Sequence, residues 1–196
     1  MDIKNIEKNY ERMSDLEIIR IATTDAHGLR PEVFGIIENE IKKRNLNTDI
    51  LKGAHAQNKE FSIEEIDTYS NLLRDLPCPI CGQTDKKLNG TISYTVKSFI
   101  VVTFSASELT IACPDCLDKK NNDALLTTIL LGWWGFPEGL FKTPIYIHKN
   151  LSLKKENRLE ISNSTLLSFT LDKIGEIETY KSDRVNLIRI IQPDED

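Results

Sequence analysis

Four cysteines are the residues of this chain best suited to chemistry. They lie in two matching units, C-P-I-C from Cys78 to Cys81 and C-P-D-C from Cys113 to Cys116, and the chain of 196 residues has no other cysteine. Two residues between cysteines let both sulfurs of a tight turn face one ion, and proline after the first cysteine favours that turn. Two such turns supply four thiolates, the ligand set of a tetrahedral zinc site. We therefore predict that these four cysteines bind one Zn²⁺ per chain.

Other uses of the thiols stay open at this stage. Iron in a rubredoxin-like site has the same four ligands as zinc, so sequence does not separate the two metals. Two independent redox pairs are less favoured, because no thioredoxin-like βαβ pattern surrounds them. Four unliganded buried thiols are a further alternative. Four sulfurs fill a tetrahedral shell and leave no position for water, so the predicted metal is structural and catalytically silent.

The stretch between the two cysteine units, Gly82 to Ala112, is 31 residues long. It suits a β-hairpin or three-strand excursion that returns the second turn to the first. Gly82 can adopt the positive φ needed after the first unit, whereas Leu117 fills the matching place in the second, so that turn should be less ideal. The pattern over roughly 78–117 resembles the zinc-ribbon family, in which C-P-x-C knuckles flank antiparallel strands. The resemblance implies a small β core held by metal.

Both tryptophans lie in L-L-G-W-W-G-F-P-E-G-L-F, at 130–141. The 14 uncharged residues at 124–137 are fewer than the about 20 apolar residues that a membrane-spanning helix needs. Two glycines and Pro137 interrupt a straight helix, and Glu138 follows at once. We therefore predict an apolar helical hairpin that reverses at these residues.

Three roles for Trp133, Trp134 and Phe136 are compatible with this position. The rings could cover the joint between the helical hairpin and the β core, which we favour because indoles bury large areas. They could instead anchor the tip in the headgroup region of a membrane. They could also form a patch that binds a protein.

A second resemblance rests on the same segment. The residues S-F at 98–99 with T at 103, then C-P-D-C, then L-L-G-W-W-G-F-P-E-G and T-P at 143–144, are similar to a group of uncharacterised bacterial proteins. In that group a zinc ribbon is followed by a G-W-W-G-[IF]-P-W-G hairpin. The resemblance covers about 78–149 and implies a fold, not an activity. Glu138 stands where the group usually has another tryptophan, which weakens a membrane role carried over from it.

Helical patterns flank the predicted core. Capping boxes begin helices at Ser14 and Ser62, and Pro31 suits the first turn of another. Residues 46–61 are irregular and read as a linker. Two or three antiparallel strands are expected between about 91 and 112, where β-branched and aromatic residues gather.

After Cys116 helical spacing returns. Two C-terminal helices are expected near 163–177 and 183–192, and R-L-E-I-S at 158–162 could instead be a strand. The predicted class is α+β: a small antiparallel zinc-ribbon β core flanked by N-terminal helices, an apolar helical hairpin and C-terminal helices. We divide the chain into a helical N-terminal region, a zinc ribbon with its Trp-rich hairpin, and a C-terminal helical segment, at 1–77, 78–149 and 150–196.

Charge argues against a nucleic-acid-binding ribbon. The net charge is −5, and the three segments carry 11 basic against 15 acidic residues, 7 against 6, and 7 against 9. None offers the broad basic surface that phosphate contacts require. No signal-peptide pattern opens the chain, so we expect a cytoplasmic protein, with membrane association as an alternative.

Motifs for catalysis are missing from the sequence. It has no phosphate-binding glycine loop and no G-x-S-x-G elbow, and His27, His55 and His148 are isolated. We lean away from an enzyme, and the sequence does not identify a small-molecule substrate. The leading hypothesis is an interaction or adaptor protein with structural zinc and a protein partner. The alternatives are a peripheral membrane protein anchored by Trp133 and Trp134, and a nucleic-acid-binding zinc ribbon.

Overall fold

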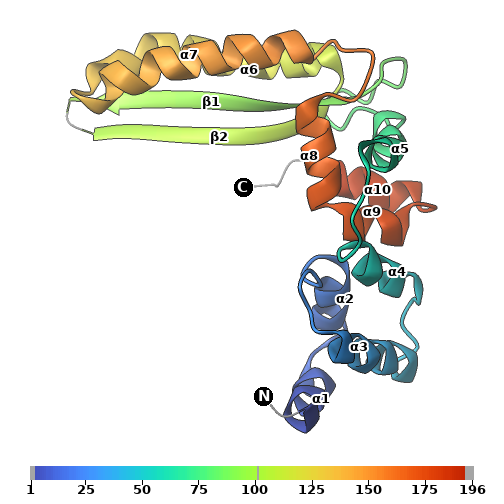
Figure 1. Cartoon of the computed structure of the whole chain (residues 1–196). Coiled ribbons are helices and arrows are strands. Elements are labelled where there is room, and N and C mark those ends of the chain that lie inside the picture. The colour runs from blue at the N-terminus through green and yellow to red at the C-terminus, as the bar shows by residue number, and fades with distance from the viewer. Residues whose placement is uncertain (1–2, 101, 193–196) are drawn as a thin grey trace. The chain divides into compact units, whose positions relative to one another are not determined.

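The structure is a computed structural model that describes residues 3–100 and 102–192 (Figure 1). Over these residues it has ten α-helices and a two-stranded antiparallel sheet, which confirms the α+β class with a small β core. The chain divides into two compact units. Unit 1 runs to Tyr69 and includes Thr170–Ile190, and unit 2 holds Ser70–Phe169 and continues from Ile191. The division into three consecutive segments stays a prediction.

Unit 1 is helical. It contains α1 (Ile3–Arg12), α2 (Asp15–Thr23), α3 (Pro31–Lys43), α4 (Asp49–Ala56), the first part of α5 (Ile63–Arg74), α9 (Ile174–Tyr180) and most of α10 (Arg184–Ile191). The predicted capping box begins α2, because Ser14 and Glu17 exchange backbone and side-chain bonds. Ser62 and Glu65 make the same exchange ahead of α5. These local signals therefore set where the helices begin.

The segment predicted as a linker contains α4, so that prediction was wrong. Helix α4 packs closely against α9 through glycine. A Cβ added at Gly53 would lie 2.2 Å from Thr179 Oγ1 and 2.4 Å from the backbone oxygen of Gly175. Ile50 and Ala54 on the same helix join the apolar core of α1–α4. The helix is thus defined by tertiary packing rather than by a strong local pattern.

Unit 2 is built on one long β-hairpin. Strands β1 (Asn89–Phe99) and β2 (Val102–Ala112) pair without interruption from Asn89↔Ala112 to Phe99↔Val102. The chain then forms α6 (Pro114–Leu131), a 3-10 turn at Gly132–Trp134, and α7 (Glu138–Glu156). Helices α6 and α7 make the predicted helical hairpin. They lie along β1, with β2 on the far side of β1 from them (Figure 1).

The C-terminal helices differ from expectation in one respect. The helix predicted near 163–177 is two helices, α8 (Ser164–Asp172) and α9, separated at Lys173. Residues 158–162 form no strand. The boundary between the two units falls inside α8, after Phe169, so most of α8 belongs to unit 2 and α9 to unit 1.

Candidate metal centre

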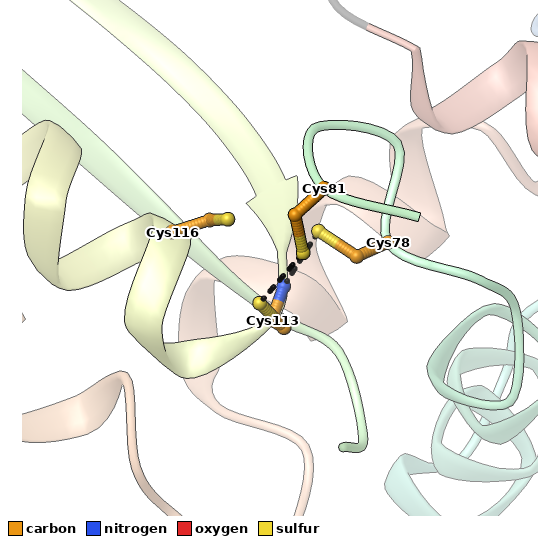
Figure 2. Close-up of side chains that lie close together, drawn as sticks. All are labelled: Cys78, Cys81, Cys113 and Cys116. Atoms are coloured by element: carbon orange, nitrogen blue, oxygen red, sulfur yellow. Dashed lines mark hydrogen bonds between the residues drawn. The ribbon is translucent and has the colours of Figure 1, made fainter. Parts of the chain in front are cut away.

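The four cysteines converge on one point. Their Sγ atoms all lie within 4.8 Å of one another, and those of Cys81 and Cys113 are 3.6 Å apart. Figure 2 shows the four side chains directed toward one another from a loop, a strand end and a helix. A tetrahedral zinc with Zn–S bonds of about 2.3 Å needs sulfurs about 3.8 Å apart. The cluster is therefore consistent with a zinc-ribbon-like site, and its residues fit a divalent metal.

The first cysteine unit is a tight turn after α5. Gly82 has a φ of +74°, the positive value that the sequence predicted. Its N–H donates to the backbone oxygen of Cys78 at 2.8 Å, and the N–H of Cys78 donates to that of Gln83 at 2.9 Å. These bonds fold the chain back on itself and place the two sulfurs on one side of the turn.

The second cysteine unit begins a helix instead of forming a second turn. Cys113 is the N-cap of α6 and Pro114 its first residue, so Cys116 falls on the same helix face as Cys113. Leu117 is a buried helical residue whose N–H donates to the backbone oxygen of Cys113 at 3.0 Å. The expectation of a less ideal turn here was wrong, because a helix needs no positive φ at this place.

The sulfurs differ in their surroundings. Cys78 and Cys113 are buried, Cys116 is half-buried and Cys81 is exposed. Burial acts to raise the pKa of the Cys78 thiol, but N–H groups of Cys113, Cys81 and Ile80 donate to its sulfur and lower the pKa to about 7. Burial raises the pKa of Cys113 and of Cys116. Cys78 is thus more readily ionised than Cys113 and Cys116, and those two gain most from a cation that stabilises thiolates.

Ion pairs at the surface link the two cysteine units. Asp115, inside the second unit, pairs with Lys86 of the loop that follows the first unit. It also pairs with Arg158 at 3.0 Å, and Arg158 reaches Asp118 at 2.8 Å. These side chains connect the metal loop, α6 and the segment after α7. Sequence reasoning missed them, since single charged residues scattered over 86–158 give no pattern.

Other ligand types do not join this cluster. Within the described ranges, 3–100 and 102–192, the cysteines are the one group of three or more potential ligands that comes together. His27 bonds with its Nδ1 to the backbone oxygen of Gln57 at 2.9 Å, and His55 stacks on Phe34. Both histidines lie in unit 1, where these contacts are structural.

The chain has no detected relative. Comparison with known protein families, with curated proteins and with solved structures found no match. No helix among the described residues combines the length and the apolar character needed to cross a bilayer.

The tryptophans lie at the other end of unit 2 from the cysteines. The end of β1, the start of β2 and the helical-hairpin turn meet there (Figure 1), and the N–H of Phe136 donates to the backbone oxygen of Ile100 at 3.3 Å. Strands of this length separate the two ends by about 35 Å. We call five exposed apolar side chains at this end the apolar tip: Phe99, Ile100, Trp133, Trp134 and Phe136.

The side chains of the tip do not cover the joint, so the favoured sequence interpretation was wrong. Trp134 is 70% exposed and Phe136 77% exposed, while Trp133 is 45% exposed. The joint is filled by small residues. A Cβ on Gly135 would lie 2.3 Å from Thr103 Oγ1, and one on Gly139 would lie 2.7 Å from Ser98 Oγ. Glycine brings the backbones together and leaves the large rings on the outside.

Proposed function

We propose that this chain is an interaction protein in which structural zinc holds one end of unit 2 and the apolar tip at the other end binds a partner. The observation that carries the proposal is the packing at the tip, which is the reverse of the packing in a protein core. Small residues fill the joint, whereas the five apolar side chains of the tip face solvent. Soluble proteins seldom expose such a patch unless it contacts something.

Backbone strain at Ile100 supports the same conclusion. This residue has a φ of +50° in the β-hairpin turn and is 82% exposed. Glycine or asparagine would adopt that conformation at lower cost, and a β-branched side chain is unfavourable there. An isoleucine at this place is therefore consistent with selection for its apolar side chain and not for the turn.

The metal contributes rigidity in this proposal. Zinc would join the loop before β1 to the end of β2 and the start of α6. The β-hairpin and the helical hairpin would then both begin at fixed positions beside the metal. Four sulfurs leave no open coordination position, which suits a structural ion. Elemental analysis of protein purified without added metal should give one zinc per chain. Iron in its place would change the metal but not its role, and a metal-free folded protein would refute this part.

A protein partner is favoured by the composition of the tip. Tryptophan and phenylalanine are frequent in the central contacts of protein interfaces. Charge near the tip is small, because Glu138 pairs with Lys142 at 2.9 Å and only Lys97 lies close by along β1. A partner would therefore be held by burial of apolar surface and not by charge.

A photo-reactive phenylalanine analogue at position 134 tests this proposal in the native cell. Covalent capture of one protein at 134, and not from a matched probe at the exposed Ile161, would support a protein partner. Capture of lipid at 134 would support the second candidate described below. Equal capture at both positions, or none at 134, would refute a contact role for the tip.

Attachment to a membrane surface is the second candidate, and the projecting shape of the tip favours it. Two adjacent turns carry aromatic side chains outward, and indole rings prefer the headgroup region. Vesicles of phosphatidylcholine, with and without phosphatidylserine, provide the test. Binding should be lost in a Trp133→Ser/Trp134→Ser double variant and kept in Ile161→Ser. Wild-type protein that stays in the supernatant with both vesicle types would exclude this candidate.

Nucleic-acid binding gains little support. The basic side chains nearest the cysteines already pair with acids: Lys86 with Asp115, and Arg158 with Asp115 and Asp118. Lys120 pairs with Glu108 on β2 at 2.6 Å. Phosphate contacts would have to displace these pairs. Retention on heparin that does not change with salt would be consistent with this negative expectation.

A further inference from the structure

The two edges of the β-hairpin differ in the hydrogen bonds that their backbone groups make with other side chains. The outer edge of β1 is covered by side-chain amides and a hydroxyl. Asn150 of α7 accepts from the N–H of Tyr94 at 2.9 Å and donates to the backbone oxygen of Tyr94 at 2.7 Å. Those are the two bonds that a residue of a third strand would make. Thr128 of α6 accepts from the N–H of Val96 at 3.1 Å.

Near the start of β1, another side-chain amide takes the place of a neighbouring strand. Asn163 accepts from the N–H of Gly90 at 3.3 Å and donates to the backbone oxygen of Gly90 at 2.6 Å. Asn163, Asn150 and Thr128 are all buried. Burying two asparagines is costly unless their bonds are made. The chain thus uses several polar side chains to close this edge.

The opposite edge, on β2, has no such cover from the residues that the structure describes. Gly90, Tyr94 and Val96 direct their backbone groups away from β2, so their register partners Ile111, Ser107 and Ser105 direct theirs away from β1. Backbone groups on this outer side of β2 recur at every second residue from 103 to 111. No hydrogen bond within the described part of the chain reaches those of Thr103, Ser105, Ser107 or Leu109.

The open edge also lacks the features that usually protect one. All residues from Phe104 to Leu109 are exposed, the pairing with β1 shows no bulge, and β2 contains neither lysine nor proline. Natural edge strands are usually short, charged, bulged or covered. An edge left this long and this neutral is suited to pairing with another strand.

We propose that the free edge of β2 pairs antiparallel with β2 of a second copy of this chain, forming a continuous four-stranded sheet. The exposed edge runs from Thr103 to Leu109, so pairing over its full length places the two-fold axis at Ala106. Thr103 then faces Leu109 of the second copy and Ser105 faces its Ser107. All of these residues direct their backbone groups to the open edge, so each facing pair exchanges both backbone hydrogen bonds.

Charge is compatible with this pairing. Glu108 is the single charged residue of β2. In the proposed register it faces Phe104 of the second copy, and Phe104 has Lys97 as its own register partner on β1. Each Glu108 therefore lies in line across the strands with Lys97 of the other copy. It does not face the Glu108 of that copy. Like charges that face each other across strands would be unfavourable. This inference goes beyond the proposed function and does not depend on the apolar tip.

Proline at position 107 gives a selective test. Ser107→Pro removes an N–H that points to the open edge and bonds to none of the described residues, so the internal ladder is kept. Ser107→Ala is the matched control, because it keeps that N–H. In sedimentation velocity over a micromolar to millimolar range, the wild type and Ser107→Ala should dimerise, and Ser107→Pro should stay monomeric with its bound metal unchanged. A wild type that is monomeric throughout, or a Ser107→Pro variant that dimerises equally, would overturn the proposal.

Hydrogen exchange of the wild type keeps the proposal testable if Ser107→Pro does not fold. The amides of Ser105 and Ser107 have no acceptor among the described residues, so we assign concentration-dependent protection to a second molecule. We expect their exchange to slow by about tenfold or more as concentration rises through the dimerisation range. Rapid exchange at every concentration would refute the pairing and leave the edge to a strand from a different protein. Trp134→Ser should dimerise normally, which separates this result from a failure of the tip proposal.

Discussion

The sulfur atoms of Cys81 and Cys113 lie 3.6 Å apart although 32 positions separate these residues in the chain. Cys81 belongs to a loop and Cys113 to the junction of β2 and α6. Their approach closes a loop that contains the whole β-hairpin. A metal at this point would tie the start of the β-hairpin to its end, so its loss should affect all of unit 2 and not a local turn.

Replacing Cys113 by serine should remove the metal. Serine is a poor zinc ligand, and the position is buried, so neither water nor a neighbouring side chain can replace the thiolate. We expect bound zinc to fall from about one per chain to near zero, with loss of cooperative unfolding, since metal binding supplies folding energy in small zinc domains. Both tryptophans lie in unit 2, so their fluorescence reports its unfolding. Ile80→Ser, an exposed change inside the first cysteine unit, should keep the zinc. Full zinc occupancy in Cys113→Ser would contradict the ligand assignment.

Replacing Gly135 by alanine should destabilise the joint below the apolar tip. The added Cβ would lie 2.3 Å from Thr103 Oγ1 and 2.9 Å from Ser98 Cβ, so the two turns must separate. Overpacking of this kind costs about 1–3 kcal/mol. Gly35→Ala is the control. Gly35 lies on an exposed position of α3 with nothing within 4 Å of an added Cβ, and the change should stabilise the helix by up to about 1 kcal/mol. Thermal unfolding followed by circular dichroism should show shifts of opposite sign.

Short-range signals predicted much of the fold. Ser14, Ser62 and Pro31 marked helix starts because capping is a local effect. The cysteine pairs predicted the metal centre because spacing and ligand type together define such a site. The start of α6 was missed although its signals are present. Cys113 precedes Pro114 and Asp115, a favourable helix start, but the metal motif suggested a second turn instead.

Features that depend on distant contacts could not be read from the sequence. Helix α4 forms because Gly53 meets α9, more than 100 positions further along the chain. The exposure of Trp134 depends on whether its indole lies inside or outside the joint between the two hairpins. The spacing of apolar residues in the sequence does not predict which. Asn150 and Asn163 look like ordinary polar residues of a helix and a loop, and only the position of β1 gives them their role.

Replacing Asn150 by leucine should weaken unit 2 and open the edge of β1. The N–H of the half-buried Tyr94 would lose its acceptor, the buried Asn150 side chain, and an N–H left unpaired inside a protein costs about 1–3 kcal/mol. Exchange of the Tyr94 amide should quicken accordingly, and exposure of a second edge should increase aggregation. Asn122→Leu, an exposed position of α6, should change neither property. Unaltered exchange at Tyr94 in Asn150→Leu would show that the side-chain amide does not act as a substitute strand.

The Glu40–Arg44 pair should make the stability of unit 1 depend on pH. Burial acts to raise the pKa of Glu40, but bonds from Arg44 and Lys43 outweigh it and hold the pKa below the ordinary value of 4.5. Arg44 also donates to the backbone oxygen of Met13 at 2.6 Å, which ties α3 to the end of α1. A lowered folded pKa means that the stabilisation is complete above the unfolded pKa and is lost as pH falls through the folded pKa.

Glu40→Gln should therefore be less stable than the wild type at neutral pH, by about 1–3 kcal/mol for a buried charged bond. The difference should shrink as pH falls below about 4.5, because the wild-type carboxylate then becomes protonated and loses its attraction to Arg44. Amide exchange in α3, measured as a function of pH, reports this difference for unit 1 alone. Glu38→Gln is the matched control: Lys42 also lowers the pKa of Glu38, but that side chain is 46% exposed, and exposed pairs contribute little. A constant difference between Glu40→Gln and wild type across this pH range would mean that Glu40 acts through packing and not through its charge.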